Sequence, residues 1–308
     1  MWNRSGLIFE PKGKRPWMHS HACTPTAFLQ NEDTIRLLFA PRNEKGQSIP
    51  SYLDVSAEDP QQVLALGERP IMTLGKTGTF DDGGIMPCCV VPFEDELRLY
   101  YVGWNASVSV PYRNAIGMAV SRDGGKSFER AFPGAVVDRN RDEPYFTASP
   151  WVFRRGDTWQ MLYTSTVRFV EVEGRQEPIY VIMQATSHDG IEWQRDAKPV
   201  LPARHDEEAI ARPTVDTHDG VYRMWFCHRA SRNFRNGPGS YRIGEAISQD
   251  GLSWERLDRS GGPDTTPGVF DAKMQTYPCI LRHRGILHLF YNGNGFGERG
   301  IGHAWRKA

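Results

Sequence analysis

Carboxylate side chains recur at one place in a repeated pattern of this 308-residue chain. Each group begins six or seven residues before a proline that opens an apolar run. The groups are Asp81 with Asp82, Glu143, Asp206 with Glu207 and Glu208, and Asp271. Carboxyl groups that share a pocket support general acid–base chemistry when one is protonated while another is ionised. The pattern therefore indicates an acid/base set drawn from several repeats.

An alternative interpretation treats these acids as a turn or cap that every repeat uses. The first repeat departs from the pattern, because its segment 17–25 holds His19 and His21 and no acid. Basic and aromatic side chains at the ends of the second runs, or in the loops after them, favour chemistry over structure. These are Arg42, Trp104, Tyr112, Arg168, His228, Arg229, Tyr241 and Arg242.

The element that must position these residues is a five-fold repeat. Its prolines are spaced 62, 63, 63 and 65 residues apart and are Pro25, Pro87, Pro150, Pro213 and Pro278. A second run follows each proline and ends in an aromatic 13 or 14 residues after it. These runs are Ile35–Phe39, Leu97–Tyr101, Trp159–Tyr163, Tyr222–Phe226 and Leu287–Tyr291. A fixed period of this length, filled with short strands and turns, is typical of propeller blades.

We therefore predict one all-β domain, 1–308, folded as a five-bladed β-propeller with four-stranded antiparallel blades. The expected blades are about 17–75, 76–138, 139–203, 204–262, and 268–308 together with 1–16. The fifth repeat holds only three strands, and the apolar run Leu7–Phe9 is the expected fourth. A ring closed by strands from both termini leaves no exposed sheet edge.

Three turns of similar sequence follow the third strands of consecutive repeats. They are Ser121–Phe128, Ser187–Trp193 and Ser248–Trp254. Asp and Gly at these positions favour tight turns, so we interpret them as structural. The chain topology places these turns on the face opposite the acids.

Composition excludes several classes of protein. The chain has 37 basic and 37 acidic residues, so no overall field attracts nucleic acid or an anionic membrane. It has no apolar stretch long enough to span a bilayer and no apolar signal-peptide core at its start. Its five cysteines show no paired or metal-ligand spacing, which favours buried thiols. We expect a cytoplasmic protein with no metal and no cofactor.

Three stretches resemble those of five-bladed propeller glycosidases, namely Gly78–Gly84, Ser187–Trp193 and Arg212–Val215. The similar groups are the arabinanases, xylosidases and fructosidases of glycoside hydrolase families 43 and 32, and the related mannoside phosphorylases. The resemblance covers nearly the whole chain and implies an axial pocket with carboxylates from different blades. The chain departs from these families in the first blade. They carry a catalytic Asp there, whereas the corresponding segment 17–25 of this chain contains no acid.

The resemblance implies catalytic roles for Asp82, Glu143 and Glu208 in cleaving a small glycan or glycoside. Trp104 would stack on a sugar ring of the substrate. Polar residues would bind the hydroxyls or a carboxylate of the substrate. The predicted substrate-binding set is His21, Arg42, Trp104, Arg212, His228, Tyr241 and Asp271.

Two other functions stay open at this point. A phosphorylase or other transferase would use the His and Arg side chains to hold phosphate. A non-catalytic carbohydrate-binding propeller would explain the missing acid of the first blade. A six-bladed sialidase is disfavoured, because only five strand pairs exist. The expected partner is a small carbohydrate, and the sequence indicates no oligomeric state.

Overall fold

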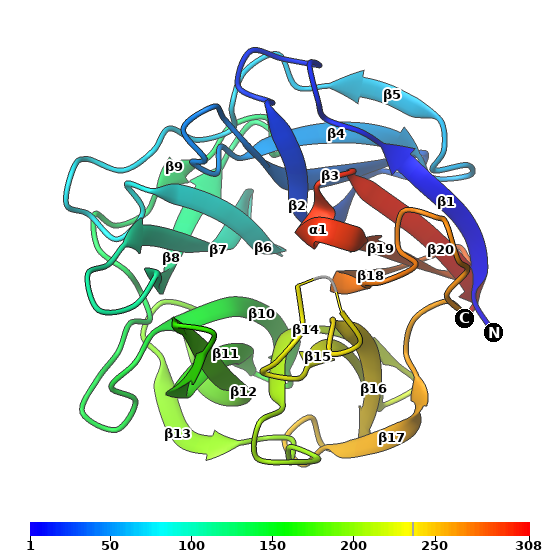
Figure 1. Ribbon diagram of the computed structural model, residues 1–308. Coiled ribbons are helices and arrows are strands. Elements are labelled where there is room, and N and C mark those ends of the chain that lie inside the picture. Colours follow the sequence, from blue (N-terminus) through cyan, green and yellow to red (C-terminus); the bar gives the residue numbers. More distant parts are fainter. Residues whose placement is uncertain (236) are drawn as a thin grey trace.

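The computed structural model describes residues 1–235 and 237–308. They form five four-stranded antiparallel sheets that stand as blades around one axis (Figure 1). The predicted five-bladed β-propeller is therefore confirmed. One short helical turn, α1 (Asn294–Gly297), lies between two strands of the last blade. In this described part of the chain, no helix has the length and apolar character needed to cross a membrane.

Each blade runs from an inner strand near the axis to an outer strand at the rim (Figure 1). The inner strands are β2 (Ser20–Asn31), β6 (Gly84–Phe93), β10 (Thr147–Arg155), β14 (Ala209–His218) and β18 (Thr276–His283). The second strands are β3 (Thr34–Arg42), β7 (Glu96–Ala106), β11 (Thr158–Val172), β15 (Val221–Arg229) and β19 (Ile286–Asn292). The third strands are β4 (Ser51–Ser56), β8 (Tyr112–Ser121), β12 (Arg175–Ser187), β16 (Arg242–Ser248) and β20 (Ile301–Lys307). The outer strands are β5 (Val63–Leu66), β9 (Glu129–Arg130), β13 (Gln194–Pro199), β17 (Glu255–Ser260) and β1 (Asn3–Phe9).

The N-terminal strand closes the ring, as the sequence predicts. Strand β1 pairs antiparallel with β20, with Asn3 opposite Trp305 and Phe9 opposite Ile301. The Trp2 indole N–H donates to the carbonyl oxygen of Gly261, which follows the fourth blade, at 2.8 Å. The two termini therefore complete the fifth blade together and attach it to the fourth.

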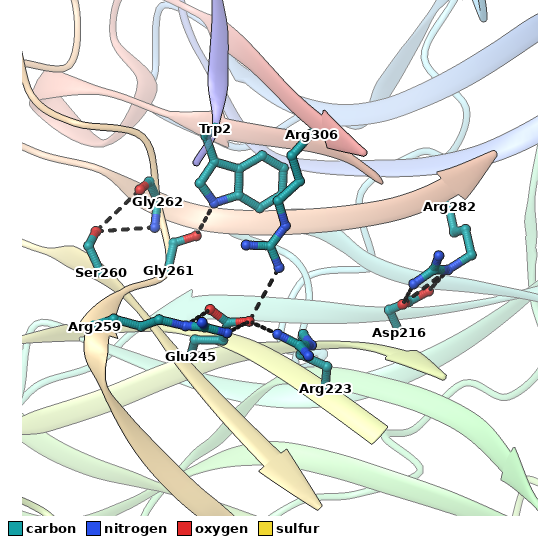
Figure 2. Close-up of polar contacts among 10 residues, drawn as sticks. All are labelled: Trp2, Asp216, Arg223, Glu245, Arg259, Ser260, Gly261, Gly262, Arg282 and Arg306. Carbon is teal, nitrogen blue, oxygen red and sulfur yellow. Dashed lines mark hydrogen bonds and ion pairs between the residues drawn. The ribbon is translucent and has the colours of Figure 1, made fainter. Parts of the chain in front are cut away.

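Charged side chains hold the fourth and fifth blades together (Figure 2). The buried carboxylate of Glu245 on β16 accepts hydrogen bonds from Arg223 at 2.8 Å, Arg259 at 2.9 Å and Arg306 at 3.3 Å. Arg306 belongs to β20 and also lies over the Trp2 ring, 4.5 Å from its centroid. This one carboxylate thus joins strands of both blades next to the point of ring closure.

The repeated prolines mark bulges in the inner strands. The register of every inner strand shifts at its proline, where two residues face one on the second strand. In four blades the residue before the proline has a positive φ, between 47° and 55°. These residues are Thr24, Ser149, Arg212 and Tyr277. Bulges and positive φ values re-aim side chains and often occur at binding sites. The sequence period therefore marks the places where the inner strands turn side chains toward the axis.

The aromatics that end the second runs form the core between blades. Their side chains are fully buried, and they are Phe39, Tyr101, Tyr163, Phe226 and Tyr291. Gly117 lies opposite Tyr101 on the next strand, and a Cβ there would come within 2.3 Å of the tyrosine ring. A larger residue at Gly117 would displace the ring, so this glycine permits the aromatic to fill the core.

The three Ser-x-Asp turns are structural, as expected. In the first, the Asp123 carboxylate accepts hydrogen bonds from the backbone N–H groups of Lys126 and Ser127, both at 3.0 Å. Partial burial alone would raise the pKa of Asp123, but hydrogen bonds from Ser127, Ser121 and Lys126 together outweigh it and lower this pKa to about 2. All five cysteines are free and buried, which confirms the predicted buried thiols.

Candidate axial binding site

A cavity of about 430 Å³ lies on the axis at the end where the inner strands begin. All five blades contribute to its wall. Four of the residues that precede the repeated prolines line it, and they are Thr24, Met86, Ser149 and Tyr277. The bulged inner strands therefore form the floor, and the loops between second and third strands form the rim.

Aromatic rings make up much of the cavity wall. They include Trp104, Tyr112, Phe146, Phe234 and Phe296. The Trp104 indole N–H donates to the Ser48 hydroxyl of the neighbouring blade at 3.1 Å, which holds the ring in place. Flat apolar surfaces of this kind pack against the faces of sugar rings or other planar ligands.

One carboxylate lines the cavity among the described residues, and it belongs to Glu177. Strands β11 and β12 extend past the blade as a long hairpin that pairs as far as Val172 and Arg175. This extension carries Glu177 to the axis. Its carboxylate is buried and receives two hydrogen bonds from the Arg235 guanidinium, at 2.6 and 3.1 Å. The two hydrogen bonds of this ion pair fix the orientation of the carboxylate.

Arg229 is a second cation of the cavity and has no carboxylate partner among the described residues. It is 2% exposed, and its Nε donates to the hydroxyls of Tyr180 at 3.2 Å and Tyr241 at 3.1 Å. Its guanidinium lies over the Phe234 ring, 3.9 Å from the centroid. The two tyrosine hydroxyls also contact each other. Aromatic rings, phenol oxygens and the carbonyl oxygens of Ala230 and Pro178 thus stabilise a buried positive charge that has no anionic partner in the described chain.

Arg212 lies against the same cavity from below. Its backbone N–H donates to the Thr164 hydroxyl at 3.2 Å. Burial raises the pKa of the nearby Cys88 thiol, and the charge of the Arg212 guanidinium opposes part of this rise. Thr164 and Cys88 both line the cavity. The Arg212 side chain crosses the axis, where Nη2 donates to the Pro25 carbonyl and the Thr26 hydroxyl at 3.2 and 3.1 Å. Its Nε and Nη1 atoms have no hydrogen-bond partner in the described chain, although the residue is 1% exposed.

Arg42 brings a further guanidinium to the cavity wall from the first blade. Burial and the nearby Arg42 charge together lower the pKa of His21 to about 4. His21 is therefore neutral at pH 7, so it adds no charge beside the cavity. His21 itself is not part of the wall in the described chain.

The acids that precede the inner strands form a structural clamp in blades two to five. In each of these blades the acid binds an arginine from the outer strand of the same blade. The pairs are Asp81–Arg130, Glu143–Arg195, Glu208–Arg256 and Asp271–Arg4. Tyrosines from the ends of the second runs donate to three of the carboxylates, and these are Tyr101, Tyr163 and Tyr291. The acids therefore tie the inner edge of a blade to its outer edge.

Glu208 shows the clamp of the fourth blade most completely. Its two carboxylate oxygens accept hydrogen bonds from Arg256 at 2.7 and 2.8 Å, and the Arg204 amide adds a third at 2.7 Å. His228 takes the place of the clamp tyrosine, with its Nδ1 atom 3.2 Å from the carboxylate. Burial raises the pKa of Glu208, but the bonds from His228 and Arg256 outweigh it and hold the pKa well below its usual range.

The first blade has a different connection, which explains its missing acid. Arg15 precedes the inner strand there, and its guanidinium donates to the carbonyl oxygens of Leu66 and Gly67 at the end of β5, both at 3.0 Å. A basic residue on the inner side and backbone acceptors on the outer side thus replace the acid–arginine pair. The first blade needs no acid for this purpose.

The structure brings only part of the predicted site together. Arg42, Trp104 and Tyr241 line the cavity, and Arg212 lies directly beneath it. The other predicted residues lie elsewhere: Asp82, Glu143, Glu208, His21, His228 and Asp271 are not part of the cavity wall. The clamp acid of the second blade is Asp81, whereas Asp82 accepts a hydrogen bond from the Gly78 amide at 2.7 Å. The predicted acid/base roles of Asp82, Glu143 and Glu208 stay predictions that no contact with the cavity supports.

Sequence reasoning missed Glu177, Arg235 and Tyr180, and it chose His228 over its neighbour Arg229. Successive residues of a strand point to opposite faces, so only one of His228 and Arg229 was expected to face the cavity. This alternation made Arg229 a candidate equal to His228. For Glu177 the signal was weak, because its segment is polar and resembles a surface loop.

No group of three His, Cys, Asp or Glu side chains suited to a metal ion occurs within residues 1–235 and 237–308. The cavity wall instead offers guanidinium, hydroxyl and aromatic groups. Such a wall is suited to binding an organic ligand through hydrogen bonds and ring contacts.

The fold and the cavity define a five-bladed propeller of the type found in glycoside hydrolases. A glycosyl hydrolase from Bacteroides ovatus has a TM-score of 0.76 at 14% identity, covering all of this chain and 95% of that one. A structure from the GH130 family of mannoside phosphorylases has a TM-score of 0.72 at 14% identity, covering all of this chain and 94% of that one. A thermostable family-43 glycoside hydrolase has a TM-score of 0.65 at 14% identity, covering 99% and 91%. At these identities the likeness shows a shared fold.

Closer similarity exists to two proteins of Mycobacterium tuberculosis. They are the uncharacterized protein Rv1502 of strain ATCC 25618 / H37Rv and the uncharacterized protein MT1551 of strain CDC 1551 / Oshkosh. Each is 36% identical over 302 residues, which cover 98% of this chain and 97% of the relative. The chain belongs to the family of these mycobacterial proteins. No protein-family model matches it.

Proposed function

We propose that this protein acts on a glycan or glycoside in the axial cavity and cleaves a glycosidic bond there. The observation that carries the proposal is the cavity itself. All five blades line it, and its wall combines aromatic rings, guanidinium groups and one carboxylate. The propeller glycoside hydrolases and the mannoside phosphorylase-family protein of similar fold support this substrate class.

We assign Glu177 the role of the carboxylate that meets the substrate. It is the acid of the cavity wall in the described part of the chain, and its ion pair with Arg235 orients it. An ionised carboxylate can act as a general base or a nucleophile. Glu143 and Glu208 instead bind arginines within their blades, and Asp82 bonds to the Gly78 amide.

Binding without turnover is the second candidate, and one observation favours it. Glycosidases commonly use two carboxyl groups about 5–9.5 Å apart, one as acid and one as base or nucleophile. Only one carboxylate lines this cavity among the described residues. Phosphorolysis is the third candidate, because Arg42 and Arg229 would suit a phosphate co-substrate.

The test is a screen of aryl glycosides and oligosaccharides with and without inorganic phosphate, followed by rates on the substrate found. We expect Glu177→Gln to lower turnover by about a hundredfold or more, since general acid–base groups contribute this much. Glu192→Gln on an exposed turn is the matched control and should retain the wild-type rate.

The outcomes separate the candidates. A rate that requires phosphate identifies a phosphorylase, and sugar binding with no turnover identifies a binding propeller. Retained turnover in Glu177→Gln, together with loss in Asp82→Asn or Glu143→Gln at an unchanged melting temperature, would restore the sequence-based assignment. If no sugar binds and none is cleaved, the proposed function is wrong.

A further inference from the structure

The axial cavity holds an excess of positive charge. Three arginines line it, and Arg212 lies beneath it, whereas Glu177 is the one carboxylate of the described wall. Only Arg235 is paired with that carboxylate. Arg42, Arg212 and Arg229 have no carboxylate within 4 Å among residues 1–235 and 237–308. The cavity and its floor therefore carry three guanidinium charges that have no counter-ion in the described part of the chain.

Burial makes this excess of positive charge unfavourable for the stability of the fold. Arg212 and Arg229 are 1% and 2% exposed, so water does little to solvate them. A buried charge without a partner destabilises a fold, and removal of a partner from a buried pair is strongly unfavourable for the same reason. The Nε and Nη1 atoms of Arg212 also lack hydrogen-bond acceptors in the described chain. Both observations point to a ligand that brings negative charge and acceptor oxygens.

The rest of the wall indicates the size and shape of that ligand. A cavity of about 430 Å³ lined by Trp104 and Phe146 is larger than an inorganic anion needs. Aromatic rings pack against sugar rings, while guanidinium groups bind carboxylate or phosphate oxygens. A neutral sugar would use the rings but would leave the charges without a counter-ion.

We propose that the ligand of this cavity is an anionic glycan, one whose sugar carries a carboxylate or a phosphate group bound by Arg42, Arg212 and Arg229. This inference rests on the proposed function and narrows its substrate class. The charged group lies toward the floor, above Arg212, and the sugar ring lies against the aromatic wall.

The test compares charged and neutral sugars of the same ring by calorimetric titration of the full chain. The pairs are glucuronate with glucose, galacturonate with galactose, and mannose 6-phosphate with mannose, with inorganic phosphate titrated alone. We expect at least one charged sugar to bind about tenfold to a hundredfold more tightly than its neutral partner. The difference should shrink as salt is added.

Three variants locate the effect. Arg42→Gln and Arg212→Gln should each remove most of the preference for the charged sugar. Arg122→Gln is the matched control, because Arg122 is an exposed arginine paired with Glu96 on a surface turn, and it should keep the preference. Arg42→Gln keeps the test valid if Arg212→Gln does not fold, because Arg42 is not fully buried.

The results distinguish this inference from the proposed function. Equal binding of charged and neutral sugars, or a preference that survives in Arg42→Gln, would overturn the anionic class and leave a glycan-active cavity intact. Inorganic phosphate that binds as tightly as mannose 6-phosphate, with no sugar preference, would also overturn it. Failure of every sugar to bind would remove the proposed function as well.

Discussion

Replacement of Glu208 by Gln tests whether the repeated acids are structural clamps or catalytic groups. The substitution keeps the size of the side chain and removes its charge. Arg256 would then lose a buried carboxylate that it contacts through both terminal nitrogens, at 2.7 and 2.8 Å. His228 would lose its partner in the same step. The glutamine would also place an NH₂ group where a donor now points, so one contact becomes repulsive.

The structure allows the size of the effect to be worked out. The side chains of Glu208 and Arg256 are 3% and 7% exposed, so the pair is buried. Breaking a buried pair by removing one partner costs about 3–5 kcal/mol. The unfolding entropy of a chain of this length is about 0.65 kcal/mol/K, at about 2.1 cal/mol/K per residue. The expected fall in melting temperature is therefore about 5–8 °C.

The assay is a thermal melt and a urea titration of the wild type, Glu208→Gln, Arg256→Met and the double variant. The double variant should be less destabilised than the sum of the two single variants, because it leaves no unpaired buried charge. Because the pKa of Glu208 is held low in the folded protein, its contribution is present above pH 4–5 and is lost on acidification through the lower folded pKa. An unchanged melting temperature with a large loss of turnover would refute the clamp and support the catalytic role that the sequence suggested.

Two further predictions concern the closing blade. Deletion of residues 1–10 removes β1 and the Trp2 contact with Gly261, so we expect a marked fall in melting temperature and soluble yield; an unchanged melt would show that the ring closes without β1. Burial, with a smaller contribution from a neighbouring histidine, lowers the pKa of His288 to about 4 and that of His303 to about 3. Both are neutral when folded but titrate near 6.5 when unfolded, so stability is complete above pH 6.5 and falls toward pH 4. The loss in urea titrations should be about 2–4 kcal/mol between pH 6.5 and 5. The double variant H288Q/H303Q should lose less, and an equal slope would contradict this origin.

The sequence alone determined the architecture. Prolines at a nearly constant spacing and aromatics 13 or 14 residues later repeat in all five blades. These signals are local, because proline and paired strands constrain the backbone near them wherever the chain goes. The missing outer strand of the last repeat and the Leu7–Phe9 run predicted closure by the N-terminus, since unpaired edges are unfavourable. The sequence also marked the cavity floor, because the residues before the prolines lie there.

Only the tertiary structure decided which side chains meet the axis. From the sequence, the adjacent residues His228 and Arg229 are equal candidates for the cavity. In the folded strand, Arg229 lines the cavity and His228 contacts Glu208 instead. The repeated spacing of the acids predicted catalytic groups, but it gave no sign of their partners, which are arginines about 50 residues or more away along the chain. Glu177 reaches the axis through an extension of a hairpin that no sequence signal required. Such choices depend on contacts between distant segments, and local preferences of the chain do not determine them.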